Sequence, residues 1–210
     1  MTIGRFITFE GGEGAGKSTQ IALLAKALDA RGIGHVVTRE PGGTPGAEAL
    51  RGLLLSPDYH WGARAEALLF AAARADHVAN RIRPALEAGQ WVLCDRFVDS
   101  SRAYQGGAGG LDDADLMALH RIGSEGILPD RTILIALDPE EASHRAKTRD
   151  GGGGDRIGAK DADYHARVRE GFAHLAENDP ERFLCIAGEG SPEQVHARIM
   201  QALAPLMAPV

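Results

Sequence analysis

The chain has 210 residues, enough for one buried core, and its formal net charge of −6 argues against a broad nucleic-acid-binding face. No apolar run approaches the roughly 18 residues of a membrane span, and the first strand pattern begins almost at the N-terminus, so we expect neither a membrane segment nor a signal peptide. Cys94 and Cys185 both lie in strand-like runs and are expected to be buried thiols in a reducing, cytoplasmic compartment.

Strand-like and helical patterns alternate along the chain. Runs rich in β-branched and aromatic residues predict strands at Arg5–Glu10, His35–Arg39, Trp91–Cys94, Arg131–Leu137 and Phe183–Ile186. Apolar residues at helical spacing predict helices at Lys17–Arg31, Ala47–Leu55, Ala63–Ala88, Asp112–Gly123, Glu140–Thr148, Asp163–Glu177 and Pro192–Met207. The alternation predicts an α/β fold in a single domain over residues 1–210, with a five-stranded parallel sheet flanked by helices.

Glycines gather in four stretches, residues 11–16, 42–46, 106–110 and 151–154, which we expect to be loops. Two helix starts carry capping signals: Asp138-Pro139 offers an N-cap followed by a proline, and Ser191-Pro192-Glu193-Gln194 fits a capping box. Ligands of parallel sheets bind beyond the carboxyl ends of the strands, and polar segments follow several of these ends. One shared site is therefore expected at that edge.

The first strand leads into Gly11-Gly12-Glu13-Gly14-Ala15-Gly16-Lys17-Ser18, which fits the phosphate-binding P-loop pattern, and a helix follows. Glycines let backbone N–H groups curl around a phosphate, and the helix N-terminus adds partial positive charge there. Lys17 is expected to reach the terminal phosphates and the Ser18 hydroxyl to bind Mg²⁺. The pattern predicts a P-loop NTPase fold that binds a nucleoside triphosphate with magnesium.

Two further strand ends carry charged pairs. Asp95 and Arg96 end the third strand, where the carboxylate can hold the magnesium shell and the guanidinium can neutralise a phosphate or the transferring group. A solvated surface ion pair is the alternative. Arg39-Glu40-Pro41-Gly42-Gly43 follows the second strand, with Arg51 on the next helix, and alone it would equally fit an ordinary turn.

Two segments have the chemistry to read a base. Phe70 and Arg74 are one helical turn apart and can stack on a ring and hold its edge, although by themselves they fit a core phenylalanine beside a solvated arginine. Ser100-Ser101-Arg102-Ala103-Tyr104-Gln105 follows the Asp95-Arg96 strand end, and the Gln105 amide can both donate to and accept from an imide edge.

Cations flank the tetraglycine of residues 151–154, and together they predict a flexible lid over about residues 145–160 that closes on polyphosphate. These cations are Arg145, Lys147, Arg149 and Arg156. A solvated basic helix end would account for Arg145 and Lys147, but it would not account for Arg156 beyond the glycines.

In this order, the segments resemble the bacterial thymidylate kinases, members of the P-loop nucleoside monophosphate kinase family, from end to end. The matching segments are Phe9–Thr19, Thr38–Thr44, Leu69–Arg74, Asp95–Phe97, Ala103–Gly107 and Asp155–Ile157. The resemblance implies a cytoplasmic dTMP kinase that transfers the γ-phosphoryl of ATP to dTMP with Mg²⁺, giving dTDP and ADP for dTTP synthesis. It also implies a homodimer packed through long helices such as Ala63–Ala88, with no nucleic-acid or membrane partner.

The resemblance also implies residue roles. Phe70 would stack on thymine, Tyr104 would lie beneath the deoxyribose, and Arg39, Arg51 and Arg96 would bind the monophosphate. The full dTMP set implied is Arg39, Glu40, Arg51, Phe70, Arg74, Arg96, Ser100, Ser101, Tyr104 and Gln105. The ATP set implied is Gly11, Gly12, Glu13, Gly14, Ala15, Gly16, Lys17, Ser18, Thr19 and Arg145. The catalytic set implied is Glu13, Lys17, Arg96, Arg149 and Arg156, and the metal set is Ser18 and Asp95.

The chain departs from the family pattern at one place. Relatives carry acidic residues after the lid arginine, where this chain has Gly158 and Lys160, with Asp161 next. Either Asp161 takes over that acidic role or the role is dispensable. Three alternative functions remain at this stage: a kinase for another nucleoside monophosphate, a P-loop switch or partitioning ATPase, and a nucleoside kinase.

Overall fold

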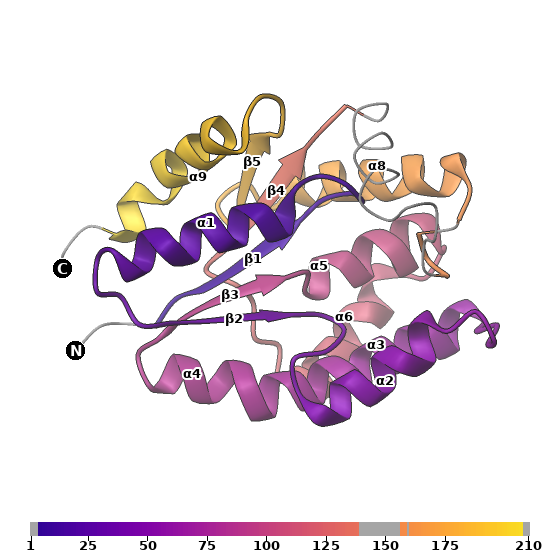
Figure 1. Ribbon diagram of the computed structural model, residues 1–210. Helices are drawn as coiled ribbons and strands as arrows, with labels where there is room; N and C mark the ends of the chain where they lie inside the picture. The colour runs from indigo at the N-terminus through magenta and orange to yellow at the C-terminus, as the bar shows by residue number, and fades with distance from the viewer. Residues whose placement is uncertain (1–3, 139–155, 159, 208–210) are drawn as a thin grey trace.

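The computed structural model describes residues 4–138, 156–158 and 160–207, and its centre is a parallel β-sheet. Figure 1 shows the five strands, which run in the order β2-β3-β1-β4-β5. Their bounds are β1 Phe6–Glu10, β2 His35–Arg39, β3 Trp91–Asp95, β4 Arg131–Ala136 and β5 Phe183–Ala187. The α/β class and the five-stranded parallel sheet are confirmed. Both ends of each predicted strand lie within one residue of the observed ends.

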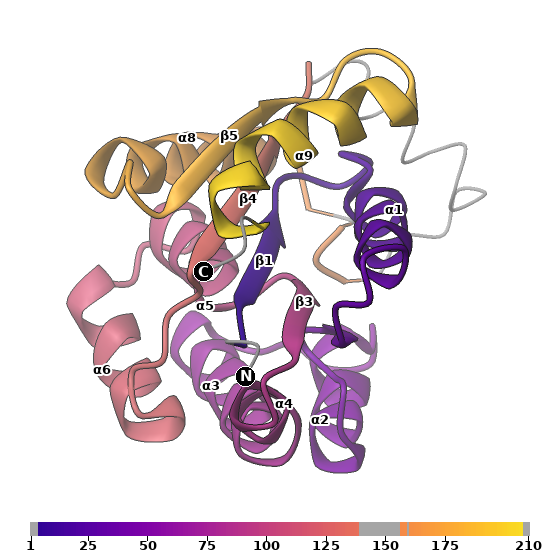
Figure 2. The ribbon, with the colours of Figure 1, turned by 90° about the vertical axis from the view of Figure 1, so that its left-hand side faces the viewer.

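Helices cover both faces of this sheet (Figure 2). Their bounds are α1 Lys17–Asp29, α2 Pro45–Leu55, α3 Ala63–His77, α4 Arg83–Glu87, α5 Val98–Ser101, α6 Asp113–Ser124, α8 Ala162–Asn178 and α9 Pro192–Met207. Two π-helical segments, η1 Val78–Ile82 and η2 Arg102–Ala108, continue α3 and α5. The predicted helix over residues 140–148 lies outside the described residues.

Alternation along the central strand explains the two-sided core. Side chains of successive strand residues point to opposite faces, so Ile7 and Phe9 pack with α1 and α9, whereas Phe6 packs with Val78 and Phe97. All five β1 residues are buried, and β1 is the middle strand of the sheet, so the segment that follows β1 lies at the middle of the sheet edge.

Several helix starts follow from capping chemistry. Ser191 and Gln194 form the predicted capping box, since the Ser191 N–H donates to Gln194 Oε1 at 2.9 Å and the Gln194 N–H to Ser191 Oγ at 3.4 Å. The α2 helix begins at Pro45, two residues before the predicted start, because Thr44 caps it through the Ala47 N–H. Thr44-Pro45 is an N-cap and proline signal that the apolar spacing alone does not reveal.

The predicted continuous helix over residues 63–88 is interrupted. A π-helical segment separates α3 from α4, and the Arg83 N–H bonds to the Val78 carbonyl five residues back. Pro84 follows directly and has no N–H to donate, so the regular hydrogen-bond ladder is broken at this point.

Two other expectations are wrong. Gly106 and Gly107 lie inside η2 instead of a loop, because this segment packs closely on α8: a Cβ on Gly107 would lie 3.2 Å from the Cα of Gly171. Cys94 is buried as expected, but Cys185 is exposed, since β5 is an edge strand that has only β4 as a neighbour. No helix within the described ranges has the length and apolarity to cross a membrane.

Candidate active site

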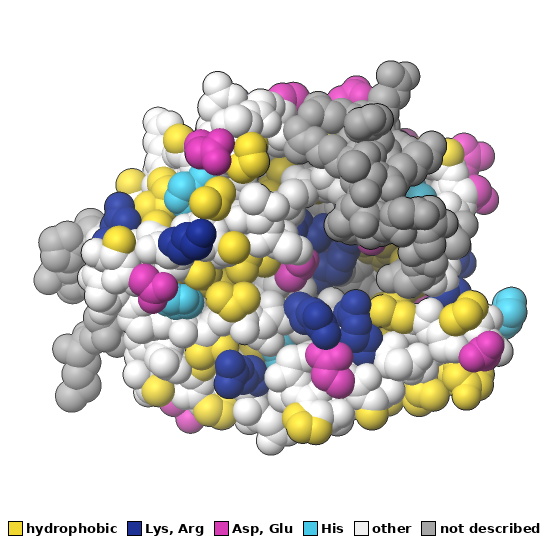
Figure 3. All heavy atoms as spheres, viewed as in Figure 1, with side chains coloured by type: hydrophobic (Ala, Val, Ile, Leu, Met, Phe, Trp, Pro, Cys, Tyr) yellow, Lys and Arg dark blue, Asp and Glu magenta, His cyan; other side chains and the backbone are white. Residues whose placement is uncertain are grey.

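A cavity of about 770 Å³ lies at the carboxyl ends of the strands. It is lined by the turns after β1, β2, β3 and β5 together with side chains of α2, α3, α5 and η2. Figure 3 shows a hollow on this side of the molecule, with Lys and Arg side chains gathered around it. The shared site that the sequence predicts at this edge is therefore a formed cavity.

The turn after β1 has the geometry of a phosphate-binding loop. Gly11, Gly14 and Gly16 have φ values of 133°, 74° and 89°, and a Cβ on Gly11 would lie 2.6 Å from the Ile135 carbonyl oxygen. The Lys17 ammonium donates to the carbonyl oxygens of Gly11 at 3.1 Å and Gly12 at 3.0 Å. Burial, together with the nearby positive charge of Arg96, lowers the pKa of Lys17 to about 8. The Lys17 ammonium is therefore held in place by two carbonyl groups with little solvent around it.

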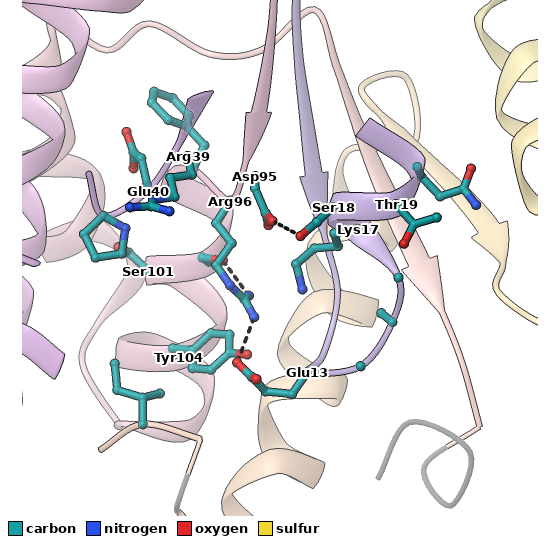
Figure 4. A pocket seen from close by; sticks show the side chains of 18 of the residues that line it. Glu13, Lys17, Ser18, Thr19, Arg39, Glu40, Asp95, Arg96, Ser101 and Tyr104 are labelled. Carbon is teal, nitrogen blue, oxygen red and sulfur yellow. Dashed lines mark hydrogen bonds and ion pairs between the residues drawn. The ribbon is translucent and has the colours of Figure 1, made fainter. Parts of the chain in front are cut away.

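The two predicted metal-binding residues are in contact. Ser18 Oγ donates to Asp95 Oδ2 at 3.1 Å, joining the start of α1 to the end of β3 (Figure 4). A hydroxyl and a carboxylate are hard oxygen donors of the kind that Mg²⁺ prefers, and protein magnesium sites use one or two such groups plus substrate phosphates. No larger cluster of acidic or histidine ligands exists in the described part of the chain.

Arg96 reaches the same place from the other side. Its Nη1 donates to the Gly11 carbonyl and to Ser100 Oγ, both at 3.2 Å, and its Nη2 lies 3.5 Å from Glu13 Oε1. Figure 4 shows the Arg96 and Lys17 side chains pointing toward the same space. Arg96 has a φ of 69°, in the left-handed region that favours glycine, so this orientation comes with local backbone strain.

Glu10, for which no role was expected, holds this turn in place. Its buried carboxylate accepts from the Phe97 N–H at 2.8 Å, the Ser100 N–H at 3.2 Å and the Ser100 hydroxyl at 2.6 Å. Desolvation outweighs the lowering effect of the Arg96 charge and raises the pKa of Glu10 to about 7. An acidic residue at the carboxyl end of a mostly apolar strand was the signal available for it in the sequence.

A second buried carboxylate organises the segment after β2. Glu40 accepts from Arg74 Nε at 2.7 Å, and its other oxygen lies 3.0 Å from His77 Nδ1. Arg74 Nη2 also donates to Ser101 Oγ at 2.9 Å and to the Phe97 carbonyl at 3.3 Å. Arg74 is therefore a buried, oriented donor at the cavity wall, and the solvated alternative is excluded.

The remaining predicted substrate residues line the same cavity. Phe70 lies beside Arg74 on α3, and the Tyr104 ring is buried with the Arg96 guanidinium 5.1 Å from its centroid. On the outer side, Arg51 donates to the Pro41 carbonyl at 2.8 Å and Arg39 to Glu48 at 3.1 Å. The structure thus brings together the P-loop and the two base-reading segments.

The predicted lid is described only at its C-terminal end. Arg145, Lys147, Arg149 and the tetraglycine lie outside the described residues. Arg156 pairs with Glu66 Oε2, which lies next to Gln105, and donates through Nε to the Leu54 carbonyl at 3.0 Å. Asp161 caps α8 through the Tyr164 N–H at 2.7 Å, and Lys160 lies 5.0 Å from the Tyr164 ring.

One end of the cavity is formed by residues that the sequence analysis did not select. They lie on α1 (Gln20), on the turn between β5 and α9 (Gly188 and Gly190) and on the first turn of α9 (Pro192 and Val195). Gln20 Nε2 donates to the Pro192 carbonyl at 2.9 Å and ties the two elements together. Two glycines directly after the fifth strand were the available signal.

Comparisons with known proteins agree with this geometry. The family model described as thymidylate kinase matches residues 9–199. A thymidylate kinase of Rhizorhabdus wittichii is 56% identical over 205 residues, covering 97% of this chain and 99% of the relative, and one of a Bradyrhizobium strain is 48% identical over 202 residues, covering 95% and 89%. The crystal structure of thymidylate kinase from Ehrlichia chaffeensis superposes with a TM-score of 0.77 at 32% identity, covering 95% and 98%.

Replacing Glu10 by Gln is expected to change how the free energy of unfolding depends on pH. The pKa of Glu10 is raised from 4.5 to about 7 by folding. Between these values the native state holds a proton that the unfolded state has released, so this group makes the unfolding free energy fall as pH rises, by up to about 1.4 kcal/mol per pH unit. Below pH 4.5 Glu10 is protonated in both states, so its contribution to the unfolding free energy is fully present there and no longer changes with pH.

Urea denaturation of both proteins from pH 4.5 to 7 tests this expectation. The unfolding free energy of the native chain minus that of Glu10→Gln should decrease steadily as the pH rises. A difference that stays constant over this range would show that folding does not raise the pKa of Glu10.

Proposed function

Because the chain belongs to the thymidylate kinase family and phosphorylates dTMP to dTDP, we propose that its cavity holds the two substrates end to end, with ATP at the P-loop and dTMP between α3 and η2. The observation that carries this arrangement is the convergence of two cations. Lys17 from α1 and Arg96 from the end of β3 both donate to the carbonyl oxygen of Gly11. An anionic group between them would take over these donors.

ATP is the phosphate donor, and we assign its triphosphate to residues 11–19. The N–H groups at the start of α1 and the Lys17 ammonium supply donors for it. We assign the adenine to the other end of the cavity, where Pro192 and Val195 offer apolar surface beside the backbone of Gly188 and Gly190. Ser18 and Asp95 would hold Mg²⁺, which would supply positive charge that neutralises the charge developing on the transferring phosphoryl group.

The monophosphate of dTMP would lie beneath Arg39, Arg51 and Arg96, with Glu13 and Glu40 beside it. Phosphoryl transfer requires in-line alignment and charge neutralisation, with little covalent work by the protein. Lys17 and Arg96 provide fixed positive charge at the transferring group, and their donors need little reorganisation. Arg145 as an ATP-binding residue and Arg149 as a catalytic residue stay predictions, because both lie outside the described residues. Arg156 would have to leave Glu66 to act as a transition-state cation.

The base of dTMP would stack on Phe70, with Arg74, Ser101 and Gln105 at its edge and Tyr104 beneath the deoxyribose. The fixed position of Arg74 supports this placement. Its guanidinium donates to Glu40, to the Phe97 carbonyl and to Ser101 Oγ, and these bonds hold it at the cavity wall. A pyrimidine with two carbonyl groups can accept from such a donor, whereas the amino group of cytosine cannot.

We also propose a cytoplasmic homodimer in which each copy is one domain over residues 1–210. The face formed by α2, α3 and α6 carries exposed apolar side chains: Leu53 (38% exposed), Leu68 (56%) and Ile122 (80%). A second copy covering this face would bury them. Sedimentation equilibrium should give twice the chain mass of 22.2 kDa, and a mass of one chain at micromolar concentration would exclude this dimer.

Acceptor specificity tests the substrate assignment. We expect ADP release with ATP and Mg²⁺ to be fastest with dTMP. It should be about 10- to 200-fold lower in kcat/KM with dUMP, since a missing methyl group in an apolar pocket is worth this much. The acceptors dCMP, AMP and thymidine should give little product. ADP release without any acceptor would point to a switch ATPase, and comparable turnover of dCMP or AMP would refute the base site.

Alanine at Lys17 or at Arg96 should lower kcat far more than it raises the KM for dTMP. Loss of one preorganised donor typically lowers kcat by about 10²–10³. Steady-state kinetics of both variants, with Arg169→Ala on the exposed face of α8 as a matched control, measures this. Near-native kcat in either variant would remove that residue from the transition state.

A further inference from the structure

Gln105 is held by a residue to which the proposed function gives no role. Gln105 Nε2 donates to Glu66 Oε1 at 2.9 Å, and both side chains are buried, at 3% and 6% exposed. The other oxygen of Glu66 accepts from Arg156. Gln105 lines the cavity, whereas Glu66 and Arg156 stand behind it.

This contact decides which way the Gln105 amide faces. A glutamine amide can turn over and present either its oxygen or its NH₂ group, because both orientations have the same shape. An ionised carboxylate can only accept hydrogen bonds, so the NH₂ group must face Glu66. The guanidinium of Arg156 has only donors and favours the carboxylate form of Glu66. The carbonyl oxygen Oε1 is left as the group that Gln105 presents to a base.

We propose that Glu66 is the positioning residue for base selection: it fixes Gln105 as a hydrogen-bond acceptor and so selects pyrimidines that carry an N–H at position 3. The inference rests on the proposed function, in which Gln105 faces the base edge. Thymine and uracil have N3–H, whereas cytosine has an N3 lone pair that would oppose the Gln105 oxygen. Glu66 itself touches no substrate and acts through Gln105.

The test is Glu66→Gln, which keeps the shape of the side chain. A glutamine at this position can donate or accept, so the Gln105 amide is free to turn over. We expect the ratio of kcat/KM for dTMP to that for dCMP to fall by about tenfold, the size of one unmade buried hydrogen bond. The ratio for dTMP to dUMP should stay unchanged, because these two share the same N3–H edge.

Two further variants separate positioning from general damage. Gln105→Met removes the amide and should lower the same ratio, and adding Glu66→Gln to it should change the ratio no further. Glu125→Gln removes a carboxylate from an ion pair on the surface and should change nothing. An unchanged dTMP to dCMP ratio in Glu66→Gln, with equal losses for all acceptors, would overturn the proposal and leave the dTMP kinase assignment intact. An unchanged ratio in Gln105→Met would instead refute the placement of Gln105 at the base edge.

A measurement on the unmutated protein applies even if Glu66→Gln does not fold. The 3-methyl analogue of dUMP keeps both carbonyl groups of the base but carries a methyl group in place of the N3 hydrogen, so it has no donor for the Gln105 oxygen. We expect its inhibition constant against dTMP to be at least about tenfold higher than that of dUMP. Equal inhibition would show that the amide oxygen does not face position 3.

Discussion

The carboxylate of Glu10 is the constraint on which the site depends. It lies at the end of the central strand and accepts two backbone N–H groups and one hydroxyl from the turn that follows β3. This turn carries Arg96 and leads directly into α5 and η2, which carry Ser101, Tyr104 and Gln105. One buried group therefore fixes the phosphate end and the base end of the cavity relative to the P-loop.

The same arrangement recurs around the cavity. Glu40 holds Arg74, Glu66 holds Arg156, and Glu10 acts on Arg96 through Ser100. Unpaired charges would be destabilising in such buried positions. Glu40 and Glu66 compensate the charges of Arg74 and Arg156 before a ligand arrives, and Glu13 lies 3.5 Å from Arg96. The donors are consequently oriented in advance, so less side-chain freedom is lost when an anion binds. For a reaction that depends on fixed positive charge, this ordering in the free protein is the main structural contribution.

The sequence predicts those features that depend on local pattern. The strands, the P-loop and the contact between Ser18 and Asp95 follow from periodicity, a contiguous motif and the rule that parallel strands end at one edge. The partners of Arg156 and Gln105 do not follow, because Glu66 lies 90 and 39 residues away from them and nothing local marks the pairing. Similarly, the glycines at 106 and 107 indicate a loop by composition, whereas close packing against Gly171 is what requires Gly107.

The left-handed backbone of Arg96 has a consequence for how this chain can change. Glycine would suit a φ of 69° better than any other residue, and relief of such strain is of the order of 1–3 kcal/mol. Selection for thermal tolerance alone would thus favour glycine at this position, whereas the phosphate-binding role that we propose for Arg96 requires arginine. Efforts to make the enzyme more robust have to exclude position 96 and look for stability in parts of the molecule that never meet a phosphate.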